Sequence, residues 1–340
     1  MSLERVVMIG AGAISNAWFQ VLAAEQVEVL AVADIQHELA VSQIAKYGVS
    51  AEAFSDFRDA LSKYHPDFVL DLTAPTARLA VAEFALKAGL HVLAEKPMAL
   101  NMDEARQIVA MSEEYGRLYT LGQSRRLDPH ADATRLTVTG GSIGTLNTVN
   151  CDCFCSRHLG SYREKVPHPL LTEMGIHHFD LARFLTGAEP LRVFTKEYSP
   201  KGSWFAGPVA ATCIFEMSDG SLFTYRGSWC AEGMETSWNG NWRLVGTLGT
   251  VLYEQDRDPV GEVVKPDGDR SGIYWERMPL KCATSPMLHS SQREVLREML
   301  DFLRAGRLPQ SECHDAIKSL GMMFAAVESS EKGDWVEVKS

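Results

Sequence analysis

Residues 5–12 read RVVMIGAG, an apolar run that ends in two glycines separated by one residue. A short apolar run before Gly-x-Gly is typical of a β-strand that turns tightly into a helix whose N-terminus binds a pyrophosphate. Ser15 stands where the usual fingerprint has a third glycine, and its side chain is small enough for close helix–strand packing. The stretch predicts the opening of a dinucleotide-binding unit, and the alternative is a tight turn without a ligand.

Asp34 supports the nucleotide interpretation. It ends a second apolar run at residues 27–34, about twenty residues after the glycines, where a carboxylate accepts hydrogen bonds from ribose hydroxyls. The same carboxylate repels a 2′-phosphate, and no Arg or Lys follows at positions 35–37. We therefore predict NAD as cofactor, with NADP less favoured. The predicted cofactor-binding residues of this region are Gly10, Gly12, Ala13, Ile14 and Asp34.

The first 122 residues alternate strand-like and helix-like segments. Apolar runs at residues 67–72, 90–94 and 118–121 flank helical patterns at 76–87 and 102–115. Strand–helix alternation with short links predicts a parallel, doubly wound sheet. We therefore expect an N-terminal Rossmann domain at residues 1–122.

After Gly122 the pattern changes to long polar–apolar alternations. They occupy residues 145–155, 210–217, 221–229 and 242–253, and helical patterns follow at 290–304 and 314–330, with a last strand at 335–338. Alternation of this kind predicts strands of an antiparallel sheet with one buried face. We expect an α+β domain at residues 123–340, built on a large, mostly antiparallel open sheet that serves substrate binding and oligomerisation. Residues 256–271, rich in Gly, Pro and charge, are expected to form a surface excursion.

Composition limits the function classes. A chain of 340 residues is too long for one ordinary core, which favours two domains. The formal net charge of −11 argues against nucleic-acid or anionic-membrane partners, because both require basic patches. We see no run of eighteen apolar residues and no signal peptide, and the seven cysteines lack framework spacing, so we expect a cytoplasmic protein.

Cys151, Cys153 and Cys155 alternate, so on a strand their thiols share one face. Positions i and i+2 fan out along a strand, and small buried side chains are therefore favoured over a metal or redox site.

An antiparallel sheet with one face uncovered by helices needs a partner. We therefore predict a homodimer or homotetramer that pairs through the open sheet.

Glu95-Lys96-Pro97 directly follows the apolar run at residues 90–94. A lysine at the carboxyl edge of the sheet, beside a nicotinamide, can hydrogen-bond a hydroxyl or carbonyl oxygen and pass a proton as hydride moves. The alternative is a solvated lysine at a strand end. Thr73-Ala74-Pro75 ends another strand at the same edge, where nucleotides lie in open α/β sheets.

Glu173 and His177 lie four residues apart in a helical pattern at residues 171–187, hence on one helix face. A carboxylate beside an imidazole fixes its tautomer and raises its basicity. The alternatives are an ordinary surface pair or a metal site with Cys313 or His314 as distant ligands. A metal site needs at least three convergent ligands, which no local spacing provides, so we predict no metal.

Together these motifs resemble the Gfo/Idh/MocA oxidoreductases, named after glucose-fructose oxidoreductase and inositol dehydrogenase. The resemblance covers nearly the whole chain. It implies that Lys96, in the family's Glu-Lys-Pro signature, is catalytic, and that Thr73, Pro75, Glu95 and Lys96 lie along the cofactor. The Lys-Pro bond is often cis in such proteins, and Arg78 stands roughly where many members carry His.

The family's Asp-x-Gly-x-His-x-x-Asp motif corresponds to residues 173–180, with Glu173 in place of the first Asp. The resemblance makes His177 and Glu173 catalytic, and makes Asp180 a substrate contact or a structural hydrogen-bonding residue. Upstream, residues 123–129 resemble the family's domain-crossing stretch. Arg126 is there our candidate for a substrate contact, with an interdomain salt bridge as the alternative.

The loop at residues 156–169 is polar, aromatic and basic, as specificity loops commonly are. Tyr162 and Arg163 fall where family members often have an aromatic–Arg pair, and we predict that both bind substrate. Residues 168–171, His-Pro-Leu-Leu, replace a common glycine run, so we expect a differently shaped mouth. Trp229, Trp238 and Trp242 could stack on a sugar ring, although aromatic residues on strands more often belong to the core or an interface.

These features predict an NAD(P)-dependent oxidoreductase that transfers hydride between nicotinamide and a secondary alcohol or ketone of a sugar, polyol or related small molecule. Lys96 and His177 would supply acid/base catalysis. Two alternatives stay open at this point: a non-catalytic cofactor-binding regulator, or tightly bound NAD used as an internal hydride relay in sugar interconversion or elimination.

Overall fold

The structure is a computed structural model that describes residues 3–158, 160, 162–287 and 291–340. The chain forms two compact units. The first comprises Met1–Ser124, Ser290–Leu320 and Ser340, and the second comprises Arg125–His289 and Gly321–Lys339. The sequence prediction placed the boundary at residues 122/123 and assigned every later residue to the second domain. In the structure, the long helix α9 (Cys313–Lys332) contributes residues to both units.

The first unit contains a six-stranded parallel sheet in the order β3-β2-β1-β4-β5-β6, the order of doubly wound dinucleotide-binding folds. The strands are β1 (Arg5–Ile9), β2 (Glu28–Ala33), β3 (Glu52–Phe54), β4 (Phe68–Asp71), β5 (His91–Ala94) and β6 (Tyr119–Leu121). The helices are α1 (Ser15–Ala24), α2 (His37–Tyr47), α3 (Phe57–Lys63), α4 (Pro75–Lys87), α5 (Met102–Tyr115) and α8 (Gln292–Ala305). This confirms the predicted Rossmann sheet.

Strand β6, at the edge of this sheet, is covered by a segment from far along the chain. The amide of Leu121 donates to the carbonyl of Ser311 at 3.0 Å, and the Ser311 hydroxyl donates back to the Leu121 carbonyl at 2.7 Å. Thr120 and Glu312 form an isolated antiparallel bridge beside these bonds. Residues 311 and 312 therefore complete the edge of the parallel sheet.

The second unit contains a nine-stranded sheet in the order β14-β13-β12-β11-β7-β10-β9-β8-β15. Its strands are β7 (Leu146–Phe154), β8 (Pro190–Tyr198), β9 (Ala210–Met217), β10 (Leu222–Ser228), β11 (Asn241–Gly246), β12 (Gly249–Tyr253), β13 (Val260–Val264), β14 (Arg277–Leu280) and β15 (Val336–Glu337). In the described part of the chain, β7 and β10 form the only parallel strand pair of this sheet. The sheet is thus mixed and mostly antiparallel, as expected.

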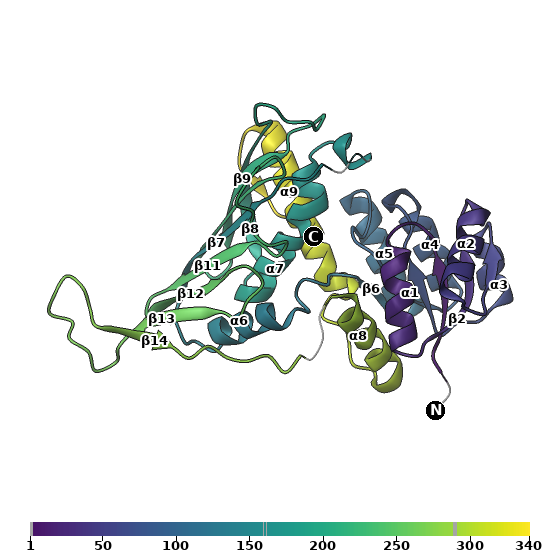
Figure 1. Cartoon of the computed structure of the whole chain (residues 1–340), viewed down its shortest axis with the longest axis horizontal. Coiled ribbons are helices and arrows are strands. Elements are labelled where there is room, and N and C mark those ends of the chain that lie inside the picture. Colours follow the sequence, from purple (N-terminus) through teal and green to yellow (C-terminus); the bar gives the residue numbers. More distant parts are fainter. Residues whose placement is uncertain (1–2, 159, 161, 288–290) are drawn as a thin grey trace. The chain divides into compact units, whose positions relative to one another are not determined.

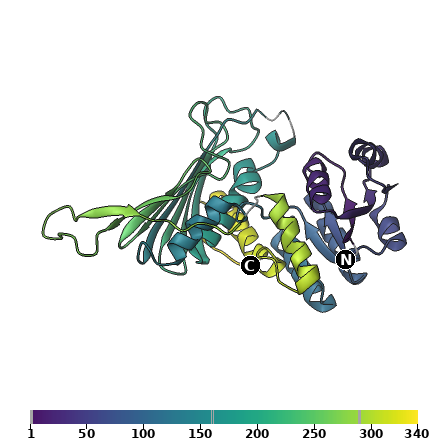
Figure 2. The same cartoon turned by 60° about the horizontal axis from the view of Figure 1, so that its bottom comes forward.

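Helices cover one face of this sheet. Figures 1 and 2 show α6 (Pro129–Thr139) and α7 (Ile176–Thr186) on the same side of the strands, and no helix formed by the described residues lies on the other face. On the covered face, Phe179 of α7 packs its ring against Phe215, Phe223 and Tyr225 at centroid distances of 5.0, 6.4 and 5.4 Å. The alternating cysteines of β7 are buried on one face, and all seven thiols of the chain are free.

One expectation about this sheet gains a strand and another needs correction. The excursion expected at residues 256–271 contains strand β13, which pairs with β12 and β14, and Figure 1 shows β13 and β14 as a projecting ribbon. The alternation at residues 242–253 is two strands, β11 and β12, because the chain reverses at Thr247 and Leu248. Gly249 opens β12 where an added Cβ would lie 2.4 Å from the Glu262 carbonyl oxygen, so β12 and β13 approach too closely there for a side chain.

Among the described residues, no helix combines the length and apolar character needed to cross a membrane.

Candidate active site

The glycine turn after β1 has the backbone that a dinucleotide site requires. Gly10 adopts φ = +100°, and a Cβ there would lie 2.8 Å from the carbonyl carbon and oxygen of Leu72. A Cβ on exposed Gly12 would instead meet nothing within 4 Å, which leaves open space above the turn. Ser15 is fully buried and its hydroxyl donates to the Gly12 carbonyl at 2.7 Å, so serine keeps the close packing usually given by glycine. Ala13 and Ile14 are exposed at the start of α1.

Asp34 lies at the end of β2 and connects it to the glycine turn. Its carboxylate accepts from the amide of Ala11 at 2.7 Å and from the amide of Gln36 at 2.8 Å. A cavity of about 450 Å³ opens beside it. The cavity is lined by side chains and backbone from the carboxyl ends of β1, β2 and β4, among them Gly10, Gly12, Asp34, Ile35, Thr73 and Ala74. Four of the predicted cofactor residues, Gly10, Gly12, Asp34 and Thr73, line this cavity, whereas Ala13, Ile14, Pro75, Glu95 and Lys96 are not among its lining residues.

This cavity suits NAD. The open space above Gly12 admits a pyrophosphate close to the backbone, and the Asp34 carboxylate has lone pairs left for ribose hydroxyls. Sequence reasoning missed Ile35 and Phe57 as lining residues. Ile35 is an exposed aliphatic side chain beside the acidic residue, and apolar character at that position was the available signal.

The turn that carries Lys96 begins at the end of β5 and is held by buried groups. The Glu95 carboxylate accepts from the indole N–H of Trp18, on α1, at 2.9 Å and from the Lys96 amide at 3.3 Å. The Lys96-Pro97 peptide bond is cis, as the family resemblance suggested. Glu95, predicted to contact the cofactor, thus uses its side chain to tie helix α1 to the lysine turn. Lys96 itself is half-buried.

The carboxylate–histidine pair lies in the second unit, on a helix that opens differently from the prediction. Residues Leu170–Gly175 form a π-helical turn, and α7 begins at Ile176, whose amide donates to the Leu171 carbonyl five residues earlier. Wide turns of this type are frequent at functional sites. A π-helical turn cannot be recognised from the spacing of apolar residues, because its single extra residue shifts the helical period only locally. Glu173 lies within the π-turn and His177 in the first turn of α7.

Glu173 forms an ion pair with Arg163, whose Nε lies 3.2 Å from the Glu173 Oε2. The carboxylate is 18% exposed and the guanidinium 43% exposed, and His177 is half-buried on the same helix. Two of the predicted substrate or catalytic residues are therefore in contact. The orientation of His177 by Glu173 stays a prediction.

Arg126 and Asp180 form a buried ion pair in the second unit. The Arg126 Nε donates to Asp180 Oδ2 at 2.9 Å, a second bond joins the Arg126 Nη2 to Asp180 Oδ1, and the two residues are 4% and 1% exposed. Bidentate pairing of this kind fixes both side chains. It gives both residues a structural role, and a substrate contact by either stays a prediction.

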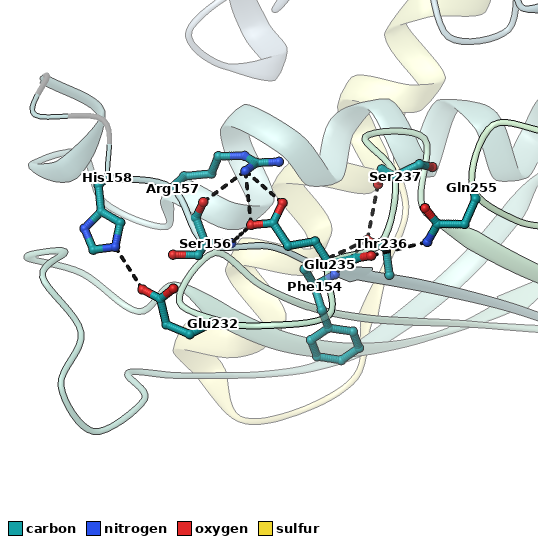
Figure 3. Close-up of polar contacts among 9 residues, drawn as sticks. All are labelled: Phe154, Ser156, Arg157, His158, Glu232, Glu235, Thr236, Ser237 and Gln255. Carbon is teal, nitrogen blue, oxygen red and sulfur yellow. Dashed lines mark hydrogen bonds and ion pairs between the residues drawn. The ribbon is translucent and has the colours of Figure 1, made fainter.

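The specificity loop predicted at residues 156–169 pairs with a second loop that the sequence did not single out. Arg157 contacts Glu235 (Nη1–Oε2 3.0 Å), and His158 Nε2 contacts Glu232 Oε1 at 2.9 Å, as Figure 3 shows. Arg157 also lies over the ring of Trp238, 4.5 Å from its centroid. Trp238 is 43% exposed, in contrast to the buried Trp229 and Trp242 of the sheet. Tyr162 opens a short 3-10 turn at Tyr162–Glu164, and its side chain lies outside the described part of the chain.

Two buried or half-buried histidines hold neighbouring segments, one at Trp238 and one just before the π-helical turn. The imidazole of His178 is buried and contacts the Trp238 carbonyl through Nε2 at 3.1 Å, and burial lowers its pKa to about 3, so it is neutral. His168, which precedes the π-turn, contacts Glu197 at 2.6 Å and Glu331 at 3.4 Å. The hydrogen bond to Glu197 raises the pKa of His168. Neither role could be foreseen, because the partners lie 29 to 163 positions away in the sequence.

The described residues contain one cluster of possible metal ligands, Glu312, Cys313 and His314, in the first unit. It does not include Glu173 or His177.

A parallel sheet in Rossmann order, a glycine turn beside a strand-end aspartate, and a lysine turn at the same sheet edge define an NAD-binding oxidoreductase. The family model described as "Oxidoreductase family, NAD-binding Rossmann fold" matches residues 4–123, and the "GFO/IDH/MocA C-terminal domain" matches residues 132–252. The chain therefore belongs to the GFO/IDH/MocA oxidoreductase family.

Curated relatives are similar over most of their length. The chain is 27% identical to D-apiose dehydrogenase of Paraburkholderia graminis over 98% of this chain and 89% of that protein. It is 27% identical to inositol 2-dehydrogenase 1 of Saccharopolyspora erythraea over 92% of this chain and 88% of that protein.

Among solved structures, an oxidoreductase from Agrobacterium radiobacter in complex with NAD⁺, L-tartaric acid and magnesium superposes with a TM-score of 0.86 at 17% identity, covering 99% of both chains. The WlbA dehydrogenase of Bordetella pertussis, in complex with NADH and UDP-GlcNAcA, gives a TM-score of 0.81 at 18% identity, covering 100% of both chains. At these identities the likeness establishes the fold.

Proposed function

We propose that this protein is an NAD-dependent dehydrogenase that interconverts a secondary alcohol and the corresponding ketone on a sugar, polyol or related small molecule, with Lys96 and His177 as the acid/base residues. Similarity to D-apiose and inositol dehydrogenases along nearly the whole chain supports this class of substrate.

One observation carries the proposal. A single guanidinium, that of Arg78, donates both to the carbonyl of Thr73, which lines the nucleotide cavity, and to the carbonyl of Glu95, the residue before Lys96. The lysine turn is therefore adjacent to the cavity, at the carboxyl ends of β4 and β5. That edge is where ligands bind in open parallel sheets.

The residues suit proton transfer to and from a hydroxyl. The Lys96 ammonium can donate a hydrogen bond to the substrate oxygen and accept its proton when the alcohol is oxidised. His177 would share this proton, with Glu173 holding the imidazole in one tautomer. Bound NAD⁺ supplies the hydride acceptor. Arg163, paired with Glu173, offers N–H donors to substrate hydroxyls from the same helix opening.

The proposal is tested by NAD⁺ reduction at 340 nm across polyols, aldoses, sugar acids and inositols. Lys96→Ala is expected to lower turnover by about 10²–10⁴-fold while NADH binding is largely retained. Lys87→Ala is the matched control, because Lys87 is exposed on α4 and its ammonium pairs with Glu83 on the same helix. Its turnover should equal that of the wild type.

The outcomes separate the functional classes. Substrate-dependent reduction that depends on Lys96 supports a dehydrogenase. Tight NADH binding without turnover on any member of the panel contradicts it and favours a cofactor-binding regulator. Nucleotide that co-purifies and resists dialysis, with no exchange into solution, favours the internal hydride relay.

A further inference from the structure

Arg78 is a buried arginine, 2% exposed, whose guanidinium donates to the carbonyl of Thr73, a residue that lines the nucleotide cavity. It lies in the first turns of α4, and its guanidinium points to the sheet edge and not to solvent. Burial of a guanidinium costs several kcal/mol unless its donors are satisfied. The buried charge of Arg78 is therefore compensated by hydrogen bonds, which an apolar side chain at this position would not make.

The guanidinium joins the ends of two neighbouring strands. On the β4 side, Nη2 donates to the Thr73 carbonyl at 2.8 Å, Nη1 reaches the Asp71 carbonyl at 3.4 Å, and Nε lies 4.0 Å from the Asp71 carboxylate. On the β5 side, Nη1 also donates to the Glu95 carbonyl. The Asp71 carboxylate is an ion-pair neighbour that accepts no hydrogen bond from Nε, and every hydrogen-bond acceptor of Arg78 named here is a main-chain carbonyl, so Arg78 fixes backbone positions.

The two strand ends that it joins carry different parts of the proposed chemistry. Thr73 begins the turn that lines the nucleotide cavity, and it is held from the other side by Asp71, whose Oδ1 accepts from the Thr73 amide at 2.9 Å and from its hydroxyl at 2.6 Å. Glu95 begins the turn of Lys96, and its side chain is fixed by Trp18. Arg78 is the link between these two braced turns.

We infer that Arg78 is a positioning residue that sets the Lys96 turn relative to the nucleotide cavity. This inference rests on the proposed function and extends it. A planar fork with several N–H donors can bond two carbonyls on separate strands at once, whereas a lysine ammonium presents its donors from one compact nitrogen and lacks the width of the fork. Chemistry depends on the placement of the acid/base group to within about 1 Å, and such a displacement can cost about 10²-fold in rate.

The experiment compares Arg78→Met and Arg78→Lys with the wild type and with Arg304→Met. Arg304 is in the same unit and loses a bidentate pair with Glu4, before β1, at the opposite edge of the sheet. It therefore reports the effect of the same chemical change away from the lysine turn. Each variant is assayed for kcat, for the equilibrium affinity for NADH, and for the pH dependence of Lys96 acylation, measured by mass spectrometry.

For Arg78→Met we expect kcat to fall about 10²-fold, while the NADH dissociation constant changes less than about tenfold. The pH dependence of Lys96 acylation should differ from that of the wild type, because the turn that carries the lysine has lost its tie to the Thr73 carbonyl. Arg78→Lys keeps the charge without the planar fork, so it should restore neither kcat nor the acylation profile. Arg304→Met should leave all three quantities unchanged.

The inference is overturned if either folded Arg78 variant keeps the wild-type kcat and Lys96 profile and differs only in thermal midpoint. If Arg78→Met does not fold, Arg78→Lys decides alone by the same criterion. A wild-type protein without Lys96-dependent turnover would defeat the proposed function first. The Lys96 acylation profile would still show whether Arg78 controls the environment of the lysine.

Discussion

Gly10 and Gly12 are two residues apart in one turn, yet the structure predicts opposite consequences for the same substitution. In Gly10→Ala the new Cβ would lie 2.8 Å from the carbonyl carbon and oxygen of Leu72 and 3.1 Å from the Thr73 amide nitrogen. That backbone cannot give way easily, because the Leu72 amide donates to the Ile9 carbonyl at 2.7 Å. The change therefore perturbs the fold itself.

The magnitude for Gly10→Ala has two parts. A side chain at φ = +100° costs about 1–2 kcal/mol of backbone strain. Displacement of closely packed neighbours adds about 1–3 kcal/mol. We expect the free energy of unfolding to fall by about 2–5 kcal/mol. In Gly12→Ala the Cβ enters open space, so the free energy of unfolding should stay within about 0.5 kcal/mol of the wild type.

For NADH affinity we expect the substitution at Gly12 to have a direct effect, although it leaves stability nearly unchanged. The Gly12→Ala methyl group occupies the space through which a pyrophosphate approaches the backbone, so NADH affinity should fall about tenfold or more, equivalent to about 1.4 kcal/mol. Urea titration measures the unfolding free energies, and NADH fluorescence titration measures the affinities. Wild-type stability of Gly10→Ala, or wild-type NADH affinity of Gly12→Ala, would refute the assignment of one glycine to the fold and the other to the ligand.

Three further predictions concern cofactor choice, pH and assembly. Asp34→Ser removes the carboxylate that repels a 2′-phosphate, so the ratio of kcat/KM for NAD⁺ over NADP⁺ should fall at least about tenfold; an unchanged ratio means that Asp34 does not select the cofactor. The hydrogen bond to Glu197 is the main reason why the pKa of His168 is raised in the folded protein. The contact therefore stabilises the fold fully below the unfolded pKa of about 6.5. This stabilisation is lost as the pH rises through the folded pKa of His168. His168→Gln should therefore flatten the decline of the unfolding free energy between about pH 6 and 8.5 in urea titrations, and an equal slope in both proteins would exclude His168 as its source. The helix-free face of the nine-stranded sheet should pair with a second copy of the chain, so light scattering at micromolar concentration should give a dimer or tetramer, whereas a monomer mass would contradict the pairing.

Local patterns were sufficient for much of the fold. The predicted strand at residues 5–9 and helix at 102–115 coincide with β1 and α5, because an apolar run before glycine and a helical period closed by Gly116 are short-range signals. Strand β3, three residues long, gave no such signal. The hairpin at Thr247 and Leu248 is flanked by Gly246 and Gly249, a turn signal that the prediction of one alternation over residues 242–253 passed over.

In the candidate site, too, some features could be predicted from the sequence and others could not. The positions of Gly10, Asp34 and Lys96 follow from motif spacing and from the rule that parallel strands end at one edge. The partners of these residues do not. The bond from Trp18 to Glu95 spans 77 positions and that of Arg126 to Asp180 spans 54, and periodicity carries no information on such pairs. The partners therefore had to come from the three-dimensional structure.

The cover of β6 by Ser311 and Glu312 also bears on how this protein can be recombined. A gene fragment that ends after residue 122 would carry all six parallel strands but leave the Leu121 amide and carbonyl without the partners that Ser311 provides. An open strand edge of this kind invites aggregation. Chimaeras that exchange the nucleotide-binding half between relatives should therefore transfer two inserts, one from each end of the gene, because a single crossover would separate a strand from its own cover.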